Sequence, residues 1–498
     1  MKRYTIILLL TAFLFTSCEG FLTQKPTQST TTDMALNDYN GLAKAVAGAY
    51  GPLASTTWYG ANLVLESEIR AGNAMNPIIS DFQSGRYQVP MQMNYNESST
   101  SGLWTYVYYM TAAVNNVLTS IEEKGADHYI TPDVTQADLD NLKAEALFLR
   151  ALAHFDGLRL YAHSWAKKSA NPDGIPIILK TDASFQEKPA RNTIEEVYTQ
   201  VISDLTTAET LIADDFTGAV SGTSTKASVS KAAIQALLSR VYLYKQDWQK
   251  AADYATKVIE SGKYTLWTAE EYPTVWGVDA AADGGEVIFE VYGNTSNDYD
   301  GYWEGPSHMT NPNGYADCAA TFELVELFEE GDVRGVTGVR GTDEGVAMFC
   351  TDPDGASQGQ MWTMKYQGKG LGDAKSKPDV NNTIVIRLSE MYLNRAEAQV
   401  NGATVAGTSA VADINAIREN RGATPLTSAG QAAVALERRL ELNFEGHLWF
   451  DLARTNSSVT YADERTVQSI SADSHYWALP IPKREIDDNE NIKQNPGY

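Results

Sequence analysis

The residues that most often build metal and redox sites are scarce in this chain. Its 498 residues include three cysteines and six histidines. Cys318 and Cys350 stand in neither a CxxC spacing nor a Cys/His ligand pattern, which argues against a zinc site built on thiolates. The HExxH and GxSxG motifs and a P-loop are also absent, since the glycine-rich segment Gly368–Gly372 lacks the GKS/T ending. We therefore expect no enzyme activity, no metal and no cofactor.

Positive charge is also in short supply. The chain has 39 lysines and arginines against 63 acids. The first 17 residues hold two of the basic residues and no acid, so the remainder carries a formal charge of −26. Nucleic acids attract clustered lysine and arginine, and no local basic stripe is present. We therefore expect no nucleic-acid partner, and the acidic surface is suited to keeping an exported protein soluble.

Long hydrophobic runs are missing except at the N-terminus. Two basic residues, Lys2 and Arg3, precede an uncharged run from Tyr4 to Phe15. As a helix this run reaches about 18 Å, well short of the roughly 30 Å hydrocarbon core of a bilayer. Small residues then lead into Cys18, which is typical of a bacterial lipoprotein signal over 1–17 with lipidation of Cys18. An ordinary secretory signal followed by a chance cysteine is the alternative.

Export would place the two remaining cysteines where a disulfide can form, and it would leave a linker between the lipidated Cys18 and the folded body. A disulfide between Cys318 and Cys350 would close a loop of about 33 residues and contribute roughly 3–4 kcal/mol. Two separate buried thiols are equally compatible with the sequence. Residues 18–33 are rich in Thr, Gln and Ser, which predicts a spacer between the lipid and the folded body.

Helical patterns dominate the first half of the body. Capping boxes at Thr135 and Thr193 predict helices over 139–162 and 193–212, and further helices are expected over 384–401 and 408–421. The clearest unit is 226–264, where two helices with small facing residues are joined by a short turn, with Asp247 as the cap of the second helix. This pattern is typical of a tetratricopeptide hairpin.

The texture changes between 265 and 380. This segment is dense in Gly, Asp, Asn and Pro, and it holds four of the ten tryptophans. We expect a short strand over 286–292 and a helix over 321–330. The predicted organisation is one domain, 34–498, with a helical scaffold in 34–264 and 381–498 and an irregular binding insertion in 265–380.

Acidic residues near the C-terminus invite a catalytic interpretation. Glu441 and Glu445 are one helical turn apart, and His447 is close by. On one helix, however, Arg438 and Arg439 lie within reach of both carboxylates, which favours ion pairs that hold helices together. A glycosidase pair elsewhere among the 63 acids stays open, because sequence does not give the distance between carboxylates.

Aromatic residues next to polar side chains are the candidates for ligand binding. A sugar ring stacks on a flat aromatic side chain and hydrogen-bonds amides and carboxylates at its edge. The predicted ligand-binding residues are Trp58, Tyr59, Tyr95, Tyr299, Tyr302, Trp303 and Trp362. The alternative is that these rings fill the core, which is where Trp104, Tyr106, Trp248 and Trp449 are expected from their helical spacing. Calcium ligation by Asp298, Asp300 and Glu304 is a weaker alternative, because the EF-hand spacing is absent.

Several separated segments together resemble the SusD/RagB family of outer-membrane nutrient-binding lipoproteins. The match runs in order from end to end, and one departure is Leu448 between His447 and the following aromatic, where the family more often has arginine. The segments that carry the resemblance are Ser17–Leu22 with Pro26, Ala144–Ala151 with Tyr161, Arg387–Ala398, Arg438–Arg454, and Leu479–Pro482 with Gln494–Tyr498.

The resemblance implies a mostly α-helical, SusD-like fold in which four tetratricopeptide-like hairpins pack against an irregular ligand-binding half. It also implies a place at the cell surface, on the outer membrane, and a partner, a SusC-like TonB-dependent transporter on which the protein sits as a lid. The cargo would be an oligosaccharide or a peptide. A surface glycoside hydrolase and a helical adaptor that binds only protein are the alternatives. Ligand aromatics are not fixed by a motif in this family, so no binding residue is transferred.

Overall fold

The computed structural model describes residues 31–77, 85–181, 187–216, 218, 225–277, 285–293, 305–339, 347–351, 359–368, 381–463 and 465–498. The lipidation residue Cys18 and the predicted ligand residues Tyr299, Tyr302 and Trp303 lie outside these ranges. Thr31, within the expected spacer, already caps the short helix α3 (Thr32–Ala35) by accepting a hydrogen bond from Met34 N.

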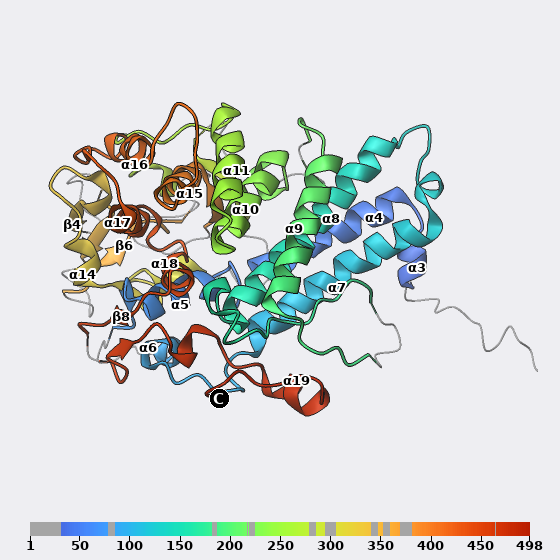
Figure 1. Ribbon diagram of the computed structural model, residues 1–498, viewed down its shortest axis with the longest axis horizontal. Helices are drawn as coiled ribbons and strands as arrows, with labels where there is room; N and C mark the ends of the chain where they lie inside the picture. Colours follow the sequence, from blue (N-terminus) through green and yellow to red (C-terminus); the bar gives the residue numbers. More distant parts are fainter. Residues whose placement is uncertain are drawn as a thin grey trace, which may run out of the picture.

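Helices packed against one another form most of the molecule (Figure 1). The long helices of the first half lie side by side at one end, and those of the last quarter lie at the other (Figure 1). Successive members are in contact from α7 to α8, α9, α10, α11 and then α15. The helices of this array are α4 (Tyr39–Ala49), α7 (Ser101–Lys124), α8 (Gln136–Tyr161), α9 (Ile194–Leu211), α10 (Lys231–Tyr244), α11 (Trp248–Glu260), α15 (Leu388–Val400), α16 (Ala410–Glu419) and α17 (Gln431–Leu442).

Local sequence signals place the ends of several of these helices. Thr135 and Thr193 form complete capping boxes with Asp138 and Glu196, so α8 and α9 begin where the sequence predicts. The hairpin expected over 226–264 is present as α10 and α11, and Asp247 caps α11 by accepting from Lys250 N. A close approach of the two helices lets a serine on α10 donate to the backbone of α11, at 2.9 Å from Ser239 Oγ to Ala251 O.

Small sheets and short helices make up most of the rest of the described chain. The strand expected over 286–292 is present as β2 (Val287–Val291), which pairs with β7 (Thr383–Arg387) in antiparallel register. A second sheet has the order β4-β5-β6. The other described elements are β1 (Ala74–Met75), β3 (Ala319–Ala320), β4 (Thr337–Val339), β5 (Phe349–Thr351), β6 (Trp362–Thr363), β8 (Val459–Thr460), β9 (Ser469–Ile470), α5 (Asn62–Ala71), α6 (Gln88–Gln92), α13 (Pro306–Met309), α14 (Phe322–Val325), α18 (Leu448–Arg454) and α19 (Lys483–Asp488).

Two helix predictions are wrong in their extent. The helix expected over 384–401 begins only at Leu388, because the β-branched residues before it pair with β2 as strand β7. The helix expected over 321–330 ends at Val325. Beyond it, Glu329 accepts hydrogen bonds from Arg418 and from the backbone N–H of Thr424. Contacts with a segment about 90 residues later in the chain therefore hold this part of the chain in place of a longer helix.

One large apolar core joins residues from most of the chain, from Leu36 to Ile492. Cys318 and Cys350 are both buried and are not joined in a disulfide, which agrees with the alternative of two separate thiols. Within the described residues, none of the helices combines the length and the apolar character that crossing a membrane requires.

Candidate functional site

A buried network of ion pairs surrounds the end of α17. Glu441 is fully buried and accepts hydrogen bonds from Arg387 at 2.6 Å, Arg421 at 2.7 Å and Arg334 at 2.9 Å. Glu445 accepts from Lys365 at 2.6 Å and from Arg387. The prediction of ion pairs is therefore confirmed.

The predicted partners of these two glutamates are wrong. Arg438 pairs instead with Asp451 at 3.1 Å, and Arg439 donates to Asn73 Oδ1 at 2.8 Å. Helix α17 ends at Leu442, so Glu445 lies beyond the helix and does not share a helical face with the arginines. Both glutamates turn to cations that come from distant parts of the chain.

The electrostatics of this network suit a structural role. Burial would raise the pKa of Glu441, but Arg421, Arg387 and Arg334 outweigh it and hold the pKa well below the usual range. Burial and the neighbouring arginines also hold the pKa of His447 well below its usual value, so this imidazole stays neutral. Both carboxylates are buried and engaged by cations, which is the arrangement of structural ion pairs.

Four of the predicted ligand aromatics are described, and all four are buried. The exposed fractions are 0% for Trp58, 4% for Tyr59, 8% for Tyr95 and 0% for Trp362. Trp58 donates from its indole to Asp156 at 2.7 Å and stacks with Tyr59, with ring centroids 6.2 Å apart. These positions agree with the alternative that the rings fill the core, and their role in ligand binding stays a prediction.

The four rings are not gathered at one place. Trp362 belongs to a small separate cluster with Ala316, Ala319 and Cys350. Tyr95 lies elsewhere, with its hydroxyl donating to Glu66 at 3.0 Å, and it lines a small cavity together with Glu66 and Arg70. Of the residues expected in the core, Trp104 and Trp449 are buried, whereas Tyr106 and Trp248 are only partly buried.

An exposed aromatic that the sequence analysis missed lies close in the chain to the predicted cluster at 299–304. Tyr315 is 36% exposed, and the Arg86 guanidinium lies 5.0 Å from its ring centroid. Arg86 Nε is 3.4 Å from Asp317, whose backbone oxygen accepts from Asn76 at 2.6 Å. Gln88 in turn donates to Asn76 at 2.5 Å. We call the set of Tyr315, Arg86, Asp317, Asn76 and Gln88 the Tyr315 surface. The run Asn311-Pro-Asn-Gly-Tyr315, with amides next to an aromatic ring in a turn, was the available signal.

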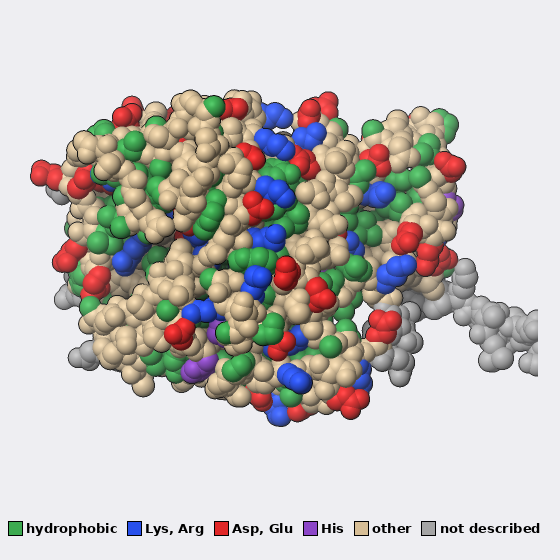
Figure 2. All heavy atoms as spheres, viewed as in Figure 1, with side chains coloured by type: hydrophobic (Ala, Val, Ile, Leu, Met, Phe, Trp, Pro, Cys, Tyr) green, Lys and Arg blue, Asp and Glu red, His purple; other side chains and the backbone are tan. Residues whose placement is uncertain are grey.

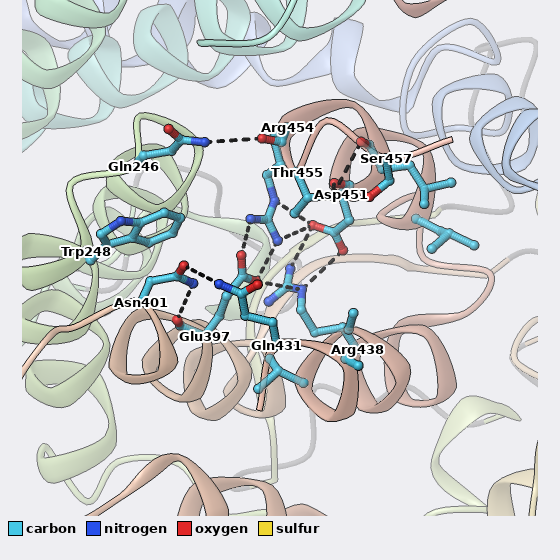
Figure 3. A pocket seen from close by; sticks show the side chains of 15 residues that line it. Gln246, Trp248, Glu397, Asn401, Gln431, Arg438, Asp451, Arg454, Thr455 and Ser457 are labelled. Atoms are coloured by element: carbon cyan, nitrogen blue, oxygen red, sulfur yellow. Dashed lines mark hydrogen bonds and ion pairs between the residues drawn. The ribbon is translucent and has the colours of Figure 1, made fainter. Parts of the chain in front are cut away.

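A groove of about 390 Å³ opens between α15, α17, α18 and the turn that joins α10 to α11 (Figure 3). Trp248 stands at its edge with the amides of Gln246 and Asn401 on either side (Figure 3). A second hollow of about 460 Å³ shares these three residues, so Trp248 borders both spaces. Trp248 is the first residue of α11, at the turn end of the helical hairpin, and it is only partly buried.

Charges within this groove cancel one another. Arg454 pairs with Glu397 and with Asp451, and Arg438 pairs with Asp451 at 3.1 Å (Figure 3). Two cations therefore face two carboxylates, and the side chains of Leu448, Leu452 and Val434 complete the lining. On the face seen in Figure 2, lysines and arginines are likewise interspersed with acids. The charged side chains of the groove are therefore occupied with one another.

Comparisons with known proteins agree with this architecture. Residues 20–243 match a family model described as starch-binding and associating with the outer membrane, and residues 340–498 match the model of the SusD family. The chain is 25% identical to SusD-like protein P38 of Formosa agariphila, with all of both chains covered. It is 24% identical to the starch-binding protein SusD of Bacteroides thetaiotaomicron, over 74% of this chain and 75% of that protein.

Solved structures extend the likeness to three dimensions. A putative sugar-binding protein of Bacteroides vulgatus superposes with a TM-score of 0.78 at 28% identity, covering 93% of this chain and 99% of its own. Surface glycan-binding protein A of Bacteroides uniformis has the same fold, with a TM-score of 0.71 at 21% identity over 92% and 99% of the two chains. The mostly helical SusD-like fold expected from the sequence is confirmed, and the chain belongs to the SusD/RagB family.

Proposed function

We propose that the protein is a cell-surface lipoprotein, anchored to the outer membrane through Cys18, that binds an oligomeric nutrient and delivers it to a SusC-like TonB-dependent transporter. We take the nutrient to be a glycan, in line with the starch-binding and glycan-binding relatives, and the protein to act as the transporter's lid. The likeness of nearly the whole chain to a structure described as a sugar-binding protein, at a TM-score of 0.78, carries the proposal. The starch-binding and glycan-binding relatives support it.

The proposed ligand contacts are Tyr299, Tyr302 and Trp303 together with the Tyr315 surface. Helix α13 begins at Pro306, three residues after Trp303, and the backbone N–H of Tyr315 donates to His308 O in that helix at 2.8 Å. The predicted cluster is therefore tied by a short stretch of chain to the exposed ring of Tyr315.

The chemistry of the Tyr315 surface suits an oligosaccharide. The ring of Tyr315 offers an apolar surface for the C–H face of a sugar, and an aromatic contact of this kind contributes about 0.5–1.5 kcal/mol. Arg86 and Gln88, which are only partly buried, supply planar groups for hydroxyls at the edge of the ring, and the buried Asn76 holds the Gln88 amide by accepting a hydrogen bond from it. Binding of this kind holds the cargo without breaking a bond in it.

Titration calorimetry against a panel of neutral and acidic oligosaccharides tests the binding function. Trp303→Ala and Tyr315→Ala are each expected to weaken the binding of a confirmed ligand about two- to tenfold, because each removes a stacking surface. Trp248→Ala, at the groove in Figure 3, is the matched aromatic control and is expected to leave the affinity unchanged. If Trp303→Ala leaves the affinity unchanged and Trp248→Ala abolishes binding, the ligand occupies the groove and the proposed placement is wrong.

The same ligands separate the proposal from its two alternatives. Chromatography of the incubated oligosaccharides is expected to show no new products, whereas cleavage that is lost on mutating one acid would identify a glycoside hydrolase. The absence of binding to every glycan, together with copurification of a protein partner without any ligand, would identify the helical adaptor.

Fractionation of cells tests the anchor and the partner. The wild-type protein is expected in the outer-membrane fraction together with a barrel transporter. Cys18→Ala removes the acylated residue, so the variant is expected in soluble form while its glycan affinity stays unchanged. A Cys18→Ala variant that stays in the membrane fraction, in cells without the transporter, would contradict the anchor.

A further inference from the structure

Arg70 differs from the other buried arginines in the partners of its guanidinium. Ten other arginines in the described ranges are buried, and each has a carboxylate oxygen at 3.1 Å or less. Arg70 is 1% exposed and has no carboxylate of the described chain within 4.0 Å. The guanidinium makes one hydrogen bond to a described residue, from Nε to Glu66 O at 3.3 Å. The two terminal nitrogens are left without an acceptor from these residues.

Two aromatic rings hold this guanidinium in place. The Arg70 Cζ atom lies 4.8 Å from the ring centroid of Trp449 and 5.7 Å from that of Tyr95. Such contacts orient a cation and contribute about 0.5–2 kcal/mol, but they supply no hydrogen-bond acceptor. The terminal nitrogens of Arg70 are not among the fully enclosed polar atoms, and Arg70 lines a cavity, so these donors are available to a molecule that enters it.

A small cavity of about 80 Å³ lies against Arg70, and Glu66 lines it as well. Glu66 is one helical turn before Arg70 on α5, a spacing that often gives an ion pair, yet no ion pair joins them. One carboxylate oxygen of Glu66 accepts a hydrogen bond from the Tyr95 hydroxyl at 3.0 Å, and this bond orients the carboxylate. The cavity thus has a cationic donor and an acidic acceptor in its wall that do not satisfy each other.

We infer that this cavity is a binding subsite for the hydroxyl edge of an uncharged sugar, in which Arg70 donates to one hydroxyl oxygen and Glu66 accepts from a hydroxyl hydrogen. A hydroxyl is both donor and acceptor, so it bridges the two side chains without adding charge. The inference rests on the proposed function and deepens it, because it adds a subsite whose lining contains no residue of the Tyr315 surface.

Charge and size together favour this class of ligand. An anion would be attracted by Arg70 but repelled by Glu66. A cation would be attracted by Glu66 but repelled by Arg70. The leucines Leu63, Leu103 and Leu160 in the lining match the C–H groups beside a sugar's hydroxyls. A space of about 80 Å³ takes the hydroxyl-bearing edge of a ring and leaves the rest of an oligosaccharide outside.

Saturation-transfer NMR with methyl α-glucoside, a neutral monosaccharide, tests the subsite directly, with acetate as the anionic probe. The wild type is expected to bind the glucoside with millimolar affinity and to bind acetate far more weakly at neutral pH. Glu66→Gln keeps the shape of the side chain but removes its charge, so it is expected to weaken glucoside binding about tenfold. Ser99→Phe is expected to abolish binding by filling the entrance from an exposed lining position, without touching the buried charges.

Controls keep this test apart from that of the proposed function. Tyr315→Ala is expected to leave monosaccharide binding unchanged while it weakens oligosaccharide binding. A crystal of the wild type soaked in the glucoside should show the sugar between Arg70 and Glu66. If the soaked crystal shows only water there, or if Ser99→Phe and Glu66→Gln both bind the glucoside like the wild type, the subsite is overturned while the proposed function stands. Loss of all glycan binding, including binding at the Tyr315 surface, would overturn both.

Discussion

Single arginines hold distant segments of this protein together through buried ion pairs. Arg240, on α10, donates two hydrogen bonds to Glu390 of α15 and a third to the backbone oxygen of Val385, all at 2.6 Å. Taking such charges out of water is expensive, and the cost is offset only while every donor and acceptor is engaged. Replacing one partner therefore leaves the other as an unpaired buried charge, and the free energy of its desolvation is no longer offset.

Arg240→Met should destabilise the protein strongly, because Glu390 is left as an uncompensated buried charge. We expect a loss of about 3–5 kcal/mol in the free energy of unfolding, measured by urea denaturation. Lys483→Met, which breaks an exposed pair with Asp487, is the matched control and should change stability by less than about 0.5 kcal/mol. Adding Glu390→Leu to Arg240→Met should restore much of the loss, and a double variant as unstable as the single one would contradict this account.

His154 makes the stability of the fold depend on pH, starting above the range where carboxylates titrate. The imidazole is fully buried in α8, and neither ring nitrogen has a hydrogen-bond partner among the described residues. Burial, with the nearby Arg150 second, lowers the pKa of His154 from 6.5 to about 3. The folded state thus keeps this group neutral while the unfolded chain takes up a proton.

Stability should therefore fall as the pH drops below about 6.5, and the contribution of His154 continues until the pH nears 3. The slope from this one group is about 1.4 kcal/mol per pH unit. Urea denaturation at pH 7.5 and pH 5 measures it. His154→Leu should lose about 2 kcal/mol less than the wild type between these two values. Equal losses in the two proteins would show that His154 is protonated in the fold or reaches solvent.

At the scale of elements, the sequence predicted what short-range chemistry determines. The capping boxes at Thr135 and Thr193 and the hairpin of α10 and α11 depend on residues a few positions apart, and they are present as expected. Strand β7 was taken for part of a helix because its partner β2 lies about a hundred residues earlier in the chain. The partners of Glu441 were missed for the same reason, since Arg334 and Arg387 come from other elements.

The capping box of α9 offers a test at this scale. Thr193 Oγ1 accepts from Glu196 N at 3.2 Å, and Glu196 accepts from Thr193 N at 2.8 Å. Thr193→Ala removes one side of this exchange and should cost about 1 kcal/mol of the free energy of unfolding, measured by urea denaturation. Thr199→Ala, an exposed position inside the same helix, is the control and should cost little. Similar losses for both variants would mean that the cap contributes nothing measurable.

At the scale of the molecule, candidate binding residues were harder to predict than the fold. Trp58 and Trp362 stand beside residues that suit a ligand site, yet tertiary packing buries both. Tyr315 is 36% exposed at the end of a polar turn, which is a local signal, but the contact of its ring with Arg86 joins positions more than 200 residues apart. Family resemblance gave the architecture, because it draws on the whole chain, while the exposure of each ring depends on contacts between distant elements.

The helical array should fold as one cooperative unit although its two parts, 34–264 and 381–498, are far apart in sequence. Helix α11 packs against α15, strand β2 pairs with β7, and Arg240 has its partner in the second part. A fragment of residues 31–264 would therefore expose the face of α11 that packs on α15 and leave Arg240 without Glu390. We expect this fragment to show no cooperative thermal unfolding in near-ultraviolet circular dichroism, whereas residues 19–498 should melt in a single transition whose calorimetric and van't Hoff enthalpies agree. Mixing the fragment with residues 265–498 should restore a cooperative transition, because the missing partners return. A fragment that melts cooperatively by itself near the temperature of the whole chain would show instead that the first part is an independent domain.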